Sequence, residues 1–341
     1  MKDRILEALA QTDGFLSGQQ LSDLLGVSRT AVWKTIGKLK SEGYEIEAVT
    51  NRGYRLINAK DADVLNQTEI ARRLSTVWAG HPVIYEKQTG STNDDIMRLA
   101  DEGAAQGTLA VASCQTAGKG RRGRTWISPD LGNVYMSILL RPQIPVQEAP
   151  MMTLIMALAC CEALQELYPG TDNGKRVQFG IKWPNDLVVS VDEGPFKKFV
   201  GILTEMRLED REIRDVTIGI GLNLNQESVD PAIRETATTL RIALGKKVNR
   251  AEITAACWNH FEPAYETYLA AGSLEPLIER YSSVLVNIGR KVRVLDPKGE
   301  FTGTAKSVTA GGELVVTTDD TAEDRLVGTG EISVRGVMGY V

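Results

Sequence analysis

The run Gly118–Trp126 limits what this chain can form more than any other stretch, because it reads G-K-G-R-R-G-R-T-W. Three glycines within six residues allow positive φ angles and a close approach to a ligand. Free backbone N–H groups together with Lys and Arg side chains suit an anion, above all phosphate. The run is not a Walker loop, and its lone G-x-G-x-x-G match is weak evidence for dinucleotide binding. A flexible basic surface loop is the alternative.

A second run, Ile181–Leu187, reads I-K-W-P-N-D-L and is flanked by apolar residues. It predicts a strand that is broken at Pro184, with Lys182, Asn185 and Asp186 presented at the break. A solvated lysine beside an ordinary Asn-Asp turn is the structural alternative for this run taken alone.

Together the two runs resemble the signature of biotin protein ligases, which have G-[RK]-G-R-x-G-R-x-W and then K-W-P-N-D at about this separation. Further motifs of that family follow its order, namely S-T-N, Q-x-A-G, K-x-x-G-I-L-x-E and I-G-I-G-x-N. In this chain they are Gly90–Asn93, Gln115–Ala117, Lys198–Glu205 and Ile218–Asn225. With two flanking regions, the resemblance covers nearly the whole chain.

The first sixty residues predict a winged helix-turn-helix. Apolar residues at helical spacing mark three helices, with Ser17 and Ser28 as N-caps, a tight turn at Gly26-Val27 and a stop at Gly43. Alternating residues in 44–49 and 54–57 predict a hairpin, the wing.

The third helix of this module would enter the major groove of DNA. The residues expected to contact DNA are Ser28, Arg29, Thr30, Trp33, Lys34 and, at the wing tip, Arg52. Residues 28–34 also resemble the recognition helix of the bifunctional biotin ligase and biotin operon repressors. A winged helix used only for protein contacts is the alternative.

Short strands and turns in residues 291–317 predict a small barrel at the other end of the chain. It resembles the SH3-like domain that ends biotin ligases, and Gly330–Arg335 matches the family's G-E-I-S-x-R. This domain could serve as a structural cap or as a functional lid, and the sequence leaves both roles open. Arg335 is the residue there whose charge could reach nucleotide or acceptor protein.

The expected fold class is therefore α+β with three domains. These are a winged helix-turn-helix in 1–62, a catalytic domain in 63–284 and an SH3-like β-barrel in 285–341. By resemblance, the catalytic domain should be a mixed α/β sheet flanked by helices, like class II aminoacyl-tRNA synthetases. The apolar stretch Met151–Leu167 would be its long buried helix.

Composition argues against several other classes. The chain carries −5 overall, but residues 1–60 hold nine Lys or Arg and seven Asp or Glu, so they carry +2 and the remainder −7. The four cysteines lack zinc-ligand spacing and indicate reduced thiols in a cytoplasmic protein, and no metal site is predicted from the residues. Two histidines argue against a Ser-His-Asp mechanism. No signal peptide or membrane span is expected.

The resemblance implies two half-reactions. Biotin's carboxylate attacks the α-phosphate of ATP to give biotinyl-5′-AMP, and a lysine of a biotin carboxyl carrier protein then attacks that mixed anhydride. The implied small molecules are ATP, Mg²⁺ and biotin as substrate. The implied partners are the carrier protein, operator DNA and, with adenylate bound, a second copy of the chain, with no membrane.

Matching motifs carry the family's roles onto this sequence. Biotin would be bound by Ser91, Thr92, Asn93, Gln115, Lys119, Gly120, Arg121 and Lys182. ATP or adenylate would be bound by Gly118, Lys119, Gly120, Arg121, Arg124, Trp126 and Asn223. Lys182 and Arg121 would be catalytic, and Asp186 is left to either Mg²⁺ or ribose. Many members have Arg in place of Lys119, and lysine keeps the charge without the bidentate fork.

Two other functions remain open from the sequence. A lipoate-type ligase shares the fold and the reaction type, but it lacks the paired glycine loop and K-W-P-N-D as spelled here. A DNA-binding regulator that only senses biotin or its adenylate would not need an intact Lys182 and glycine loop.

Overall fold

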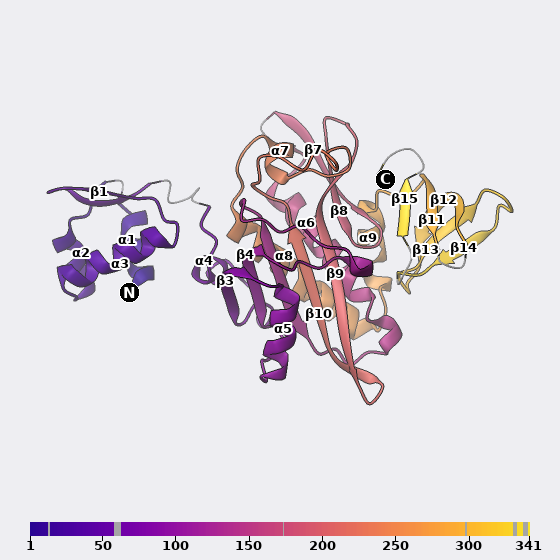
Figure 1. The fold of residues 1–341 in the computed structure, drawn as a ribbon, viewed down its shortest axis with the longest axis horizontal. Coiled ribbons are helices and arrows are strands. Elements are labelled where there is room, and N and C mark those ends of the chain that lie inside the picture. Colours follow the sequence, from indigo (N-terminus) through magenta and orange to yellow (C-terminus); the bar gives the residue numbers. More distant parts are fainter. Residues whose placement is uncertain (13, 58–62, 173, 297–298, 330–332, 337–339) are drawn as a thin grey trace. The chain divides into compact units, whose positions relative to one another are not determined.

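The structure is a computed structural model that describes residues 1–341 apart from 13, 58–62, 173, 297–298, 330–332 and 337–339. The described residues form two compact units, Met1–Glu69 and Ile70–Val341. In Figure 1 the first unit begins at the indigo end of the chain and the second ends in yellow.

Helices and one hairpin build the described part of the first unit. The helices are α1 (Lys2–Ala10), α2 (Gly18–Leu25), α3 (Arg29–Ser41) and the start of α4 (Gln67–Ala71). Ser17 begins α2 in a capping box with Gln20, and Ser28 begins α3 by accepting from the Ala31 N–H group at 3.2 Å. Gly26, at φ 66°, ends α2, so the predicted helix-turn-helix is confirmed. The core consists of Ile5, Leu9, Leu21, Val32, Ile36, Leu39, Tyr44, Ile46 and Val64.

The predicted wing is the antiparallel pair β1 (Ile46–Val49) and β2 (Gly53–Leu56). Leu16 joins it through two backbone hydrogen bonds with Tyr54, at 2.8 and 2.9 Å. Gly53 lies at φ 107°, and a Cβ atom there would come within 2.1 Å of the Leu16 carbonyl oxygen. Only glycine therefore fits where the wing meets the segment before α2.

A mixed sheet forms the centre of the second unit. Within the described residues it has eight strands in the order β3-β4-β5-β10-β9-β8-β7-β6. They are β3 (Val83–Thr89), β4 (Leu109–Gln115), β5 (Val134–Leu140), β6 (Thr171–Asp172), β7 (Lys175–Lys182), β8 (Asp186–Val191), β9 (Lys197–Glu209) and β10 (Glu212–Leu222). Neighbours are antiparallel except for the parallel pair β3 and β4.

Helices pack against this sheet (Figure 1). They are α5 (Thr92–Asp101), α6 (Met151–Leu167), α7 (Leu240–Leu244), α8 (Arg250–Ala271) and α9 (Ile278–Val284), with 3-10 turns η1 (Arg121–Gly123), η2 (Val146–Glu148) and η3 (Glu275–Leu277). The expected buried helix is α6, which is apolar on nearly all sides because it packs between α8 and the sheet. Among the described helices, only the stretch Val146–Leu167 is long and apolar enough to cross a membrane, and it is mostly buried in the protein, as a core helix is.

A second sheet follows α9. Its described strands are β11 (Lys291–Leu295), β12 (Phe301–Val308), β13 (Leu314–Thr318), β14 (Asp324–Val327) and β15 (Ser333–Gly336), in the order β14-β13-β12-β11-β15. In the described residues the edge strands β14 and β15 do not pair with each other, so closure into a barrel is not established. The predicted turn residues Pro297 and Lys298, and Gly330–Ile332 of the G-E-I-S motif, lie outside the described residues.

Candidate active site

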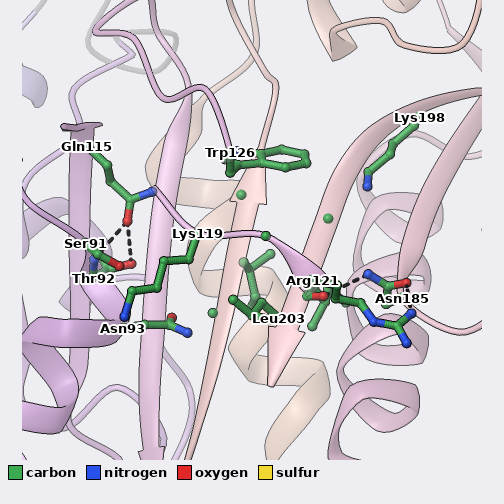
Figure 2. A pocket seen from close by; sticks show the side chains of 16 residues that line it. Ser91, Thr92, Asn93, Gln115, Lys119, Arg121, Trp126, Asn185, Lys198 and Leu203 are labelled. Atoms are coloured by element: carbon green, nitrogen blue, oxygen red, sulfur yellow. Dashed lines mark hydrogen bonds between the residues drawn. The ribbon is translucent and has the colours of Figure 1, made fainter. Parts of the chain in front are cut away.

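A cavity lies between the start of α5, the glycine run, the middle of β9 and the last residues of β10 (Figure 2). It is lined by Ser91, Thr92, Asn93, Gln115, Lys119, Gly120, Arg121, Trp126, Asn185, Lys198, Gly201, Ile202, Leu203, Gly219, Ile220 and Gly221. Most of the residues predicted to bind biotin are therefore brought together in this first cavity.

The polar side of the first cavity is a fixed network of hydrogen bonds. The Thr92 N–H and hydroxyl groups both donate to Gln115 Oε1, at 2.8 and 3.1 Å (Figure 2). Ser137 Oγ lies 2.6 Å from Asn93 Oδ1, and Asn93 Nδ2 donates to Glu205 Oε2 at 2.5 Å. Because these side chains are buried or partly buried and partnered, their remaining donors and acceptors face the cavity in defined directions.

The glycines of the I-G-I-G motif leave room for the side chains of Asn93 and Trp126. Gly219 and Gly221 lie on the same face of β10, since side chains two apart on a strand share a face. A Cβ atom on Gly219 would come within 2.0 Å of Asn93 Oδ1, and one on Gly221 within 2.3 Å of Trp126 Nε1. The Trp126 ring thus lies flat over the sheet, above the first cavity.

The glycine run forms a compact loop rather than an extended segment. Gly120 donates to the Arg124 carbonyl at 2.7 Å, and Trp126 donates to the Gly118 carbonyl at 2.9 Å. Arg122 closes the turn in the left-handed region, at φ 59°. A Cβ atom on Gly118 would meet the Trp126 carbonyl oxygen at 2.4 Å, so this glycine is required by close packing.

Two cations of the loop are held by other elements. Lys119 forms an ion pair with Asp94 on α5, and that contact raises the pKa of Lys119 despite partial burial. Arg121 donates to Asn185 Oδ1 at 2.9 Å and to the Thr329 carbonyl at 2.8 Å. The loop is therefore fastened both to the first cavity and to the segment after β14.

A second cavity adjoins the first and shares Arg121, Asn185 and Lys198 with it. Its full lining is Arg121, Arg124, Lys182, Trp183, Pro184, Asn185, Asp186, Lys198, Ile233, Thr236, Val334, Arg335 and Tyr340. Cations dominate this lining, and the acidic residue in it is Asp186.

The K-W-P-N-D run shapes this second cavity as a hairpin turn and not as an interruption within one strand. Lys182 ends β7, Asp186 begins β8, and the two residues pair across the turn. The Trp183 N–H group donates to Asn287 Oδ1 at 2.7 Å, and its indole N–H group donates to the Gly312 carbonyl at 3.2 Å. These two contacts anchor the turn, so the prediction of a single broken strand is corrected to a reversal.

Lys182 is a strongly perturbed charge of the second cavity. The residue is only 5% exposed. Burial, with the nearby charges of Lys198 and Arg335, lowers the pKa of Lys182 to about 8, although Asp186 acts in the opposite direction. A buried ammonium in a cavity is a strong candidate for contact with an anion.

Asp186 already has partners in this structure. It forms an ion pair with Lys198 at 2.5 Å and accepts from the Tyr340 hydroxyl at 2.5 Å. Burial pushes the pKa of Asp186 upward, but Lys198 and Lys182 outweigh it and hold the pKa below its ordinary value. Among the described residues there is no cluster of three or more metal-ligating side chains.

Several residues that were predicted to bind biotin or nucleotide therefore do not line the cavity that holds the rest of their predicted set. Lys182 lines the second cavity and not the first, and in the described residues neither cavity is lined by Gly118 or Asn223. Sequence reasoning gave no role to Asn185 or Lys198, although both stand in the motifs that carried the resemblance. The sequence feature that could have identified them is their position in those motifs, Asn185 in the same run as Lys182 and Lys198 in the same run as Gly201.

In the first unit, the exposed face of α3 lies beside the wing. Arg29, Thr30 and Trp33 line one hollow with the turn between β1 and β2, and the Trp33 residue is 65% exposed. Arg52, at the wing tip, stacks over the Phe15 ring at 4.6 Å from its centroid. Ser28 caps the helix, and Lys34 is exposed one residue beyond Trp33.

Comparison with known proteins agrees with both units. Residues 85–223 match the model of the biotin/lipoate A/B protein ligase family, and residues 2–55 match an HTH domain. The bifunctional ligase/repressor BirA of Bacillus subtilis (strain 168) is 39% identical over 323 residues, which are 94% of this chain and 95% of that protein. The chain belongs to the bifunctional ligase/repressor family.

Other relatives extend the comparison. The bifunctional ligase/repressor BirA of Escherichia coli (strain K12) is 28% identical to this ligase/repressor, covering 97% of this chain and 96% of that one. Among solved structures, the biotin protein ligase from Aquifex aeolicus in complex with biotin and ATP has a TM-score of 0.61 and 28% identity. It covers 74% of this chain, and 98% of its own length is matched.

Proposed function

We propose that this ligase/repressor activates biotin with ATP as biotinyl-5′-AMP, transfers the biotinyl group to a lysine of a biotin carboxyl carrier protein, and represses transcription when the adenylate is bound. The observation that carries the proposal is the meeting of two cavities at Arg121, Asn185 and Lys198. One side of the first cavity is a network of hydrogen-bonded polar side chains, and the second cavity is rich in cations. Such a pair suits an uncharged ring system with a carboxylate tail beside a nucleotide.

Biotin is assigned to the first cavity. The network of Thr92, Asn93 and Gln115 offers fixed donors and acceptors to a neutral, hydrogen-bonding ring. Trp126 and the strand residues Ile202 and Leu203 supply apolar surface. The carboxylate tail would then point to the shared wall, where Lys198 and Arg121 lie.

The nucleotide is assigned to the second cavity, with its α-phosphate near Lys182. Attack of the carboxylate oxygen on phosphorus forms one P–O bond and breaks another, releasing pyrophosphate. Cations fixed where charge gathers on the phosphoryl oxygens favour that transition state, and exclusion of water strengthens them. In the second step the acceptor amine attacks the acyl carbon, AMP leaves with the bonding electrons, and no enzyme nucleophile is needed.

Mg²⁺ would accompany the nucleotide rather than a preformed protein site. Asp186 is engaged by Lys198 and Tyr340, and the described residues offer no acidic cluster. Mg²⁺ is commonly held by substrate phosphates, waters and one or two carboxylates. It would supply charge neutralisation on the leaving pyrophosphate.

The rate of adenylation should fall at alkaline pH. Lys182 acts as a cation, and burial lowers its pKa to about 8, so its charged form is present below that pH and is lost above it. We expect kcat/KM for biotin-dependent ATP–pyrophosphate exchange to drop about tenfold per pH unit above the pKa. A flat profile between pH 7 and 10 would contradict the role of a charged Lys182.

Gly221→Ala should weaken biotin binding. The added Cβ atom would lie within 2.3 Å of Trp126 Nε1, so the ring must leave its place over the first cavity. We expect the Kd of biotin, measured by calorimetry, to rise about tenfold or more. Gly90→Ala is the matched control, because nothing lies within 4 Å of a Cβ atom there. Equal affinities in both variants would argue against the first cavity as the biotin site.

Arg121→Gly should loosen retention of the adenylate more than it slows adenylate synthesis. Arg121 fastens the glycine loop to Asn185 and Thr329 across both cavities. Without it, released biotinyl-AMP should label lysines of unrelated proteins. Streptavidin blotting with bovine serum albumin as bystander measures this. Labelling that stays confined to the carrier domain would show that the loop does not retain the adenylate.

Several finer features belong to the same proposal. We expect a cytoplasmic protein that dimerises with adenylate bound and contacts operator DNA through α3 and the wing. We also expect the catalytic unit to resemble class II aminoacyl-tRNA synthetases and the sheet β11–β15 to close as an SH3-like barrel.

One experiment tests the enzyme against its alternatives. The protein is mixed with ATP, a carrier domain and either biotin or lipoate, and the carrier's mass is measured. A biotinyl mass gain on one lysine supports the proposal, and a lipoyl gain would favour the lipoate-type ligase. No gain with either acid, together with biotin binding, would favour a regulator that only senses its ligand.

A further inference from the structure

Lys182 is a buried ammonium whose hydrogen-bond donors no described residue uses. In the part of the chain that the structure describes, no residue accepts a hydrogen bond from Lys182 Nζ, and the contact made by this atom is with an aromatic ring. Burial disfavours a charged amine, so that ring contact replaces part of the lost hydration.

The ring belongs to Tyr340, beyond β15. Its centroid lies 3.5 Å from Lys182 Nζ, and its hydroxyl donates to Asp186 Oδ2 at 2.5 Å. Burial, with Asp186 nearby, raises the pKa of Tyr340 well above its ordinary value, so the phenol stays protonated and remains a donor. The Tyr340 side chain therefore contacts both Lys182 and Asp186, the first and last residues of the K-W-P-N-D run.

We propose that Tyr340 is a positioning residue for adenylation, whose ring keeps the Lys182 ammonium charged and at the wall of the nucleotide cavity until a phosphate engages its donors. This rests on the proposed function of Lys182. An aromatic face attracts a cation while leaving its N–H groups available. A carboxylate in the same place would form an ion pair that the incoming phosphate would have to break.

The surrounding charges make the ring's contribution measurable. Asp186, on β8, favours the ammonium but is shared with Lys198 on β9. Lys198 and Arg335, on β15, disfavour it. Arg121 and Arg124 of the glycine loop line the same cavity and add positive charge. With cations in excess, weakening the ring's attraction should lower the pKa of Lys182.

A fluorination series on the whole protein tests this without changing the packing. Tyr340→Phe keeps the ring and is the reference, and 3,5-difluoro- and 3,4,5-trifluorophenylalanine at position 340 withdraw electron density from its face. The pKa of Lys182 is read directly by NMR of ¹³Cε-labelled lysine, with Lys182→Met used to assign the signal. We expect the pKa to fall stepwise, by up to about one unit.

The rate of ATP–pyrophosphate exchange is then measured against pH for the same series. The pH at which kcat/KM falls in the alkaline range should decrease by the same amount as the pKa of Lys182. An unchanged Lys182 titration across the series would overturn the proposal. A uniform loss of kcat with no shift of the alkaline pH dependence would also overturn it, because a purely structural residue would act in that way. So would a lower KM for ATP as the single change, because that would show that the ring merely obstructs the nucleotide cavity. An inactive wild-type protein would contradict the proposed function, while the NMR titration would still decide the role of Tyr340.

Discussion

Lys182→Ala should lower the rate of biotin adenylation by at least about a hundredfold, which is the usual loss when one preorganised donor to a transition state is removed. The residue is buried at the cation-rich cavity, and no described residue uses its donors, so its charge is available to the α-phosphate. Biotin-dependent ATP–pyrophosphate exchange measures the effect. Biotin affinity should change little, because the lining of the first cavity excludes Lys182 among the described residues.

Two variants control for folding. Lys182→Met keeps the apolar stem and removes only the charge, so it should be as inactive as Lys182→Ala and melt at or above the wild-type temperature. Lys175→Ala, at the other end of β7, should be fully active. Near-normal exchange in Lys182→Met would remove the ammonium from the mechanism.

Biotin plus ATP should raise operator affinity by about a hundredfold or more. The N-terminal module is small and carries about +2, so a single copy should bind DNA weakly, whereas two linked copies gain through effective concentration. The proposed adenylate site lies in the unit Ile70–Val341, and the residues proposed to contact DNA lie in Met1–Glu69. The coupling must therefore run through an ordered loop or a shared interface, and it must be reciprocal. Footprinting with and without biotin and ATP measures it.

Separate variants should divide the two activities. Trp33→Ala removes an exposed side chain of α3, so it should abolish operator protection and leave adenylation unchanged. Lys182→Met should retain the module but lose the response to biotin and ATP. Equal operator occupancy with and without the small molecules would contradict corepression and leave the ligase activity untouched.

Much of the fold could be predicted because its signals are short in range. Ser17, Gly26 and Ser28 mark the helix-turn-helix within a dozen residues, and caps of this kind act on the nearest backbone groups. The apolar stretch that became α6 was recognisable by length and composition alone. The turn in K-W-P-N-D was harder, since a proline shows where a strand stops but not whether the chain reverses there.

The sequence indicated many of the residues that line the candidate site, but not which of the two cavities each of them lines. The glycine run pointed to an anion site, and five of its residues, Lys119, Gly120, Arg121, Arg124 and Trp126, do line one or both cavities. Placing Lys182 in the second cavity needed the structure, because its surroundings come from β8, β9 and residues beyond β14. Tyr340 carried no recognisable signal at all.

The sequence by itself determined the helix-turn-helix, the order of the ligase motifs and the family to which the chain belongs. Only the tertiary structure decided how charge is shared across the site. Arg121 meets Thr329 from 208 positions away, and Tyr340 meets Asp186 from 154 positions away. The physical reason is that caps and periodicity act over a few residues, whereas burial and ion pairing depend on every segment that reaches the same point in space.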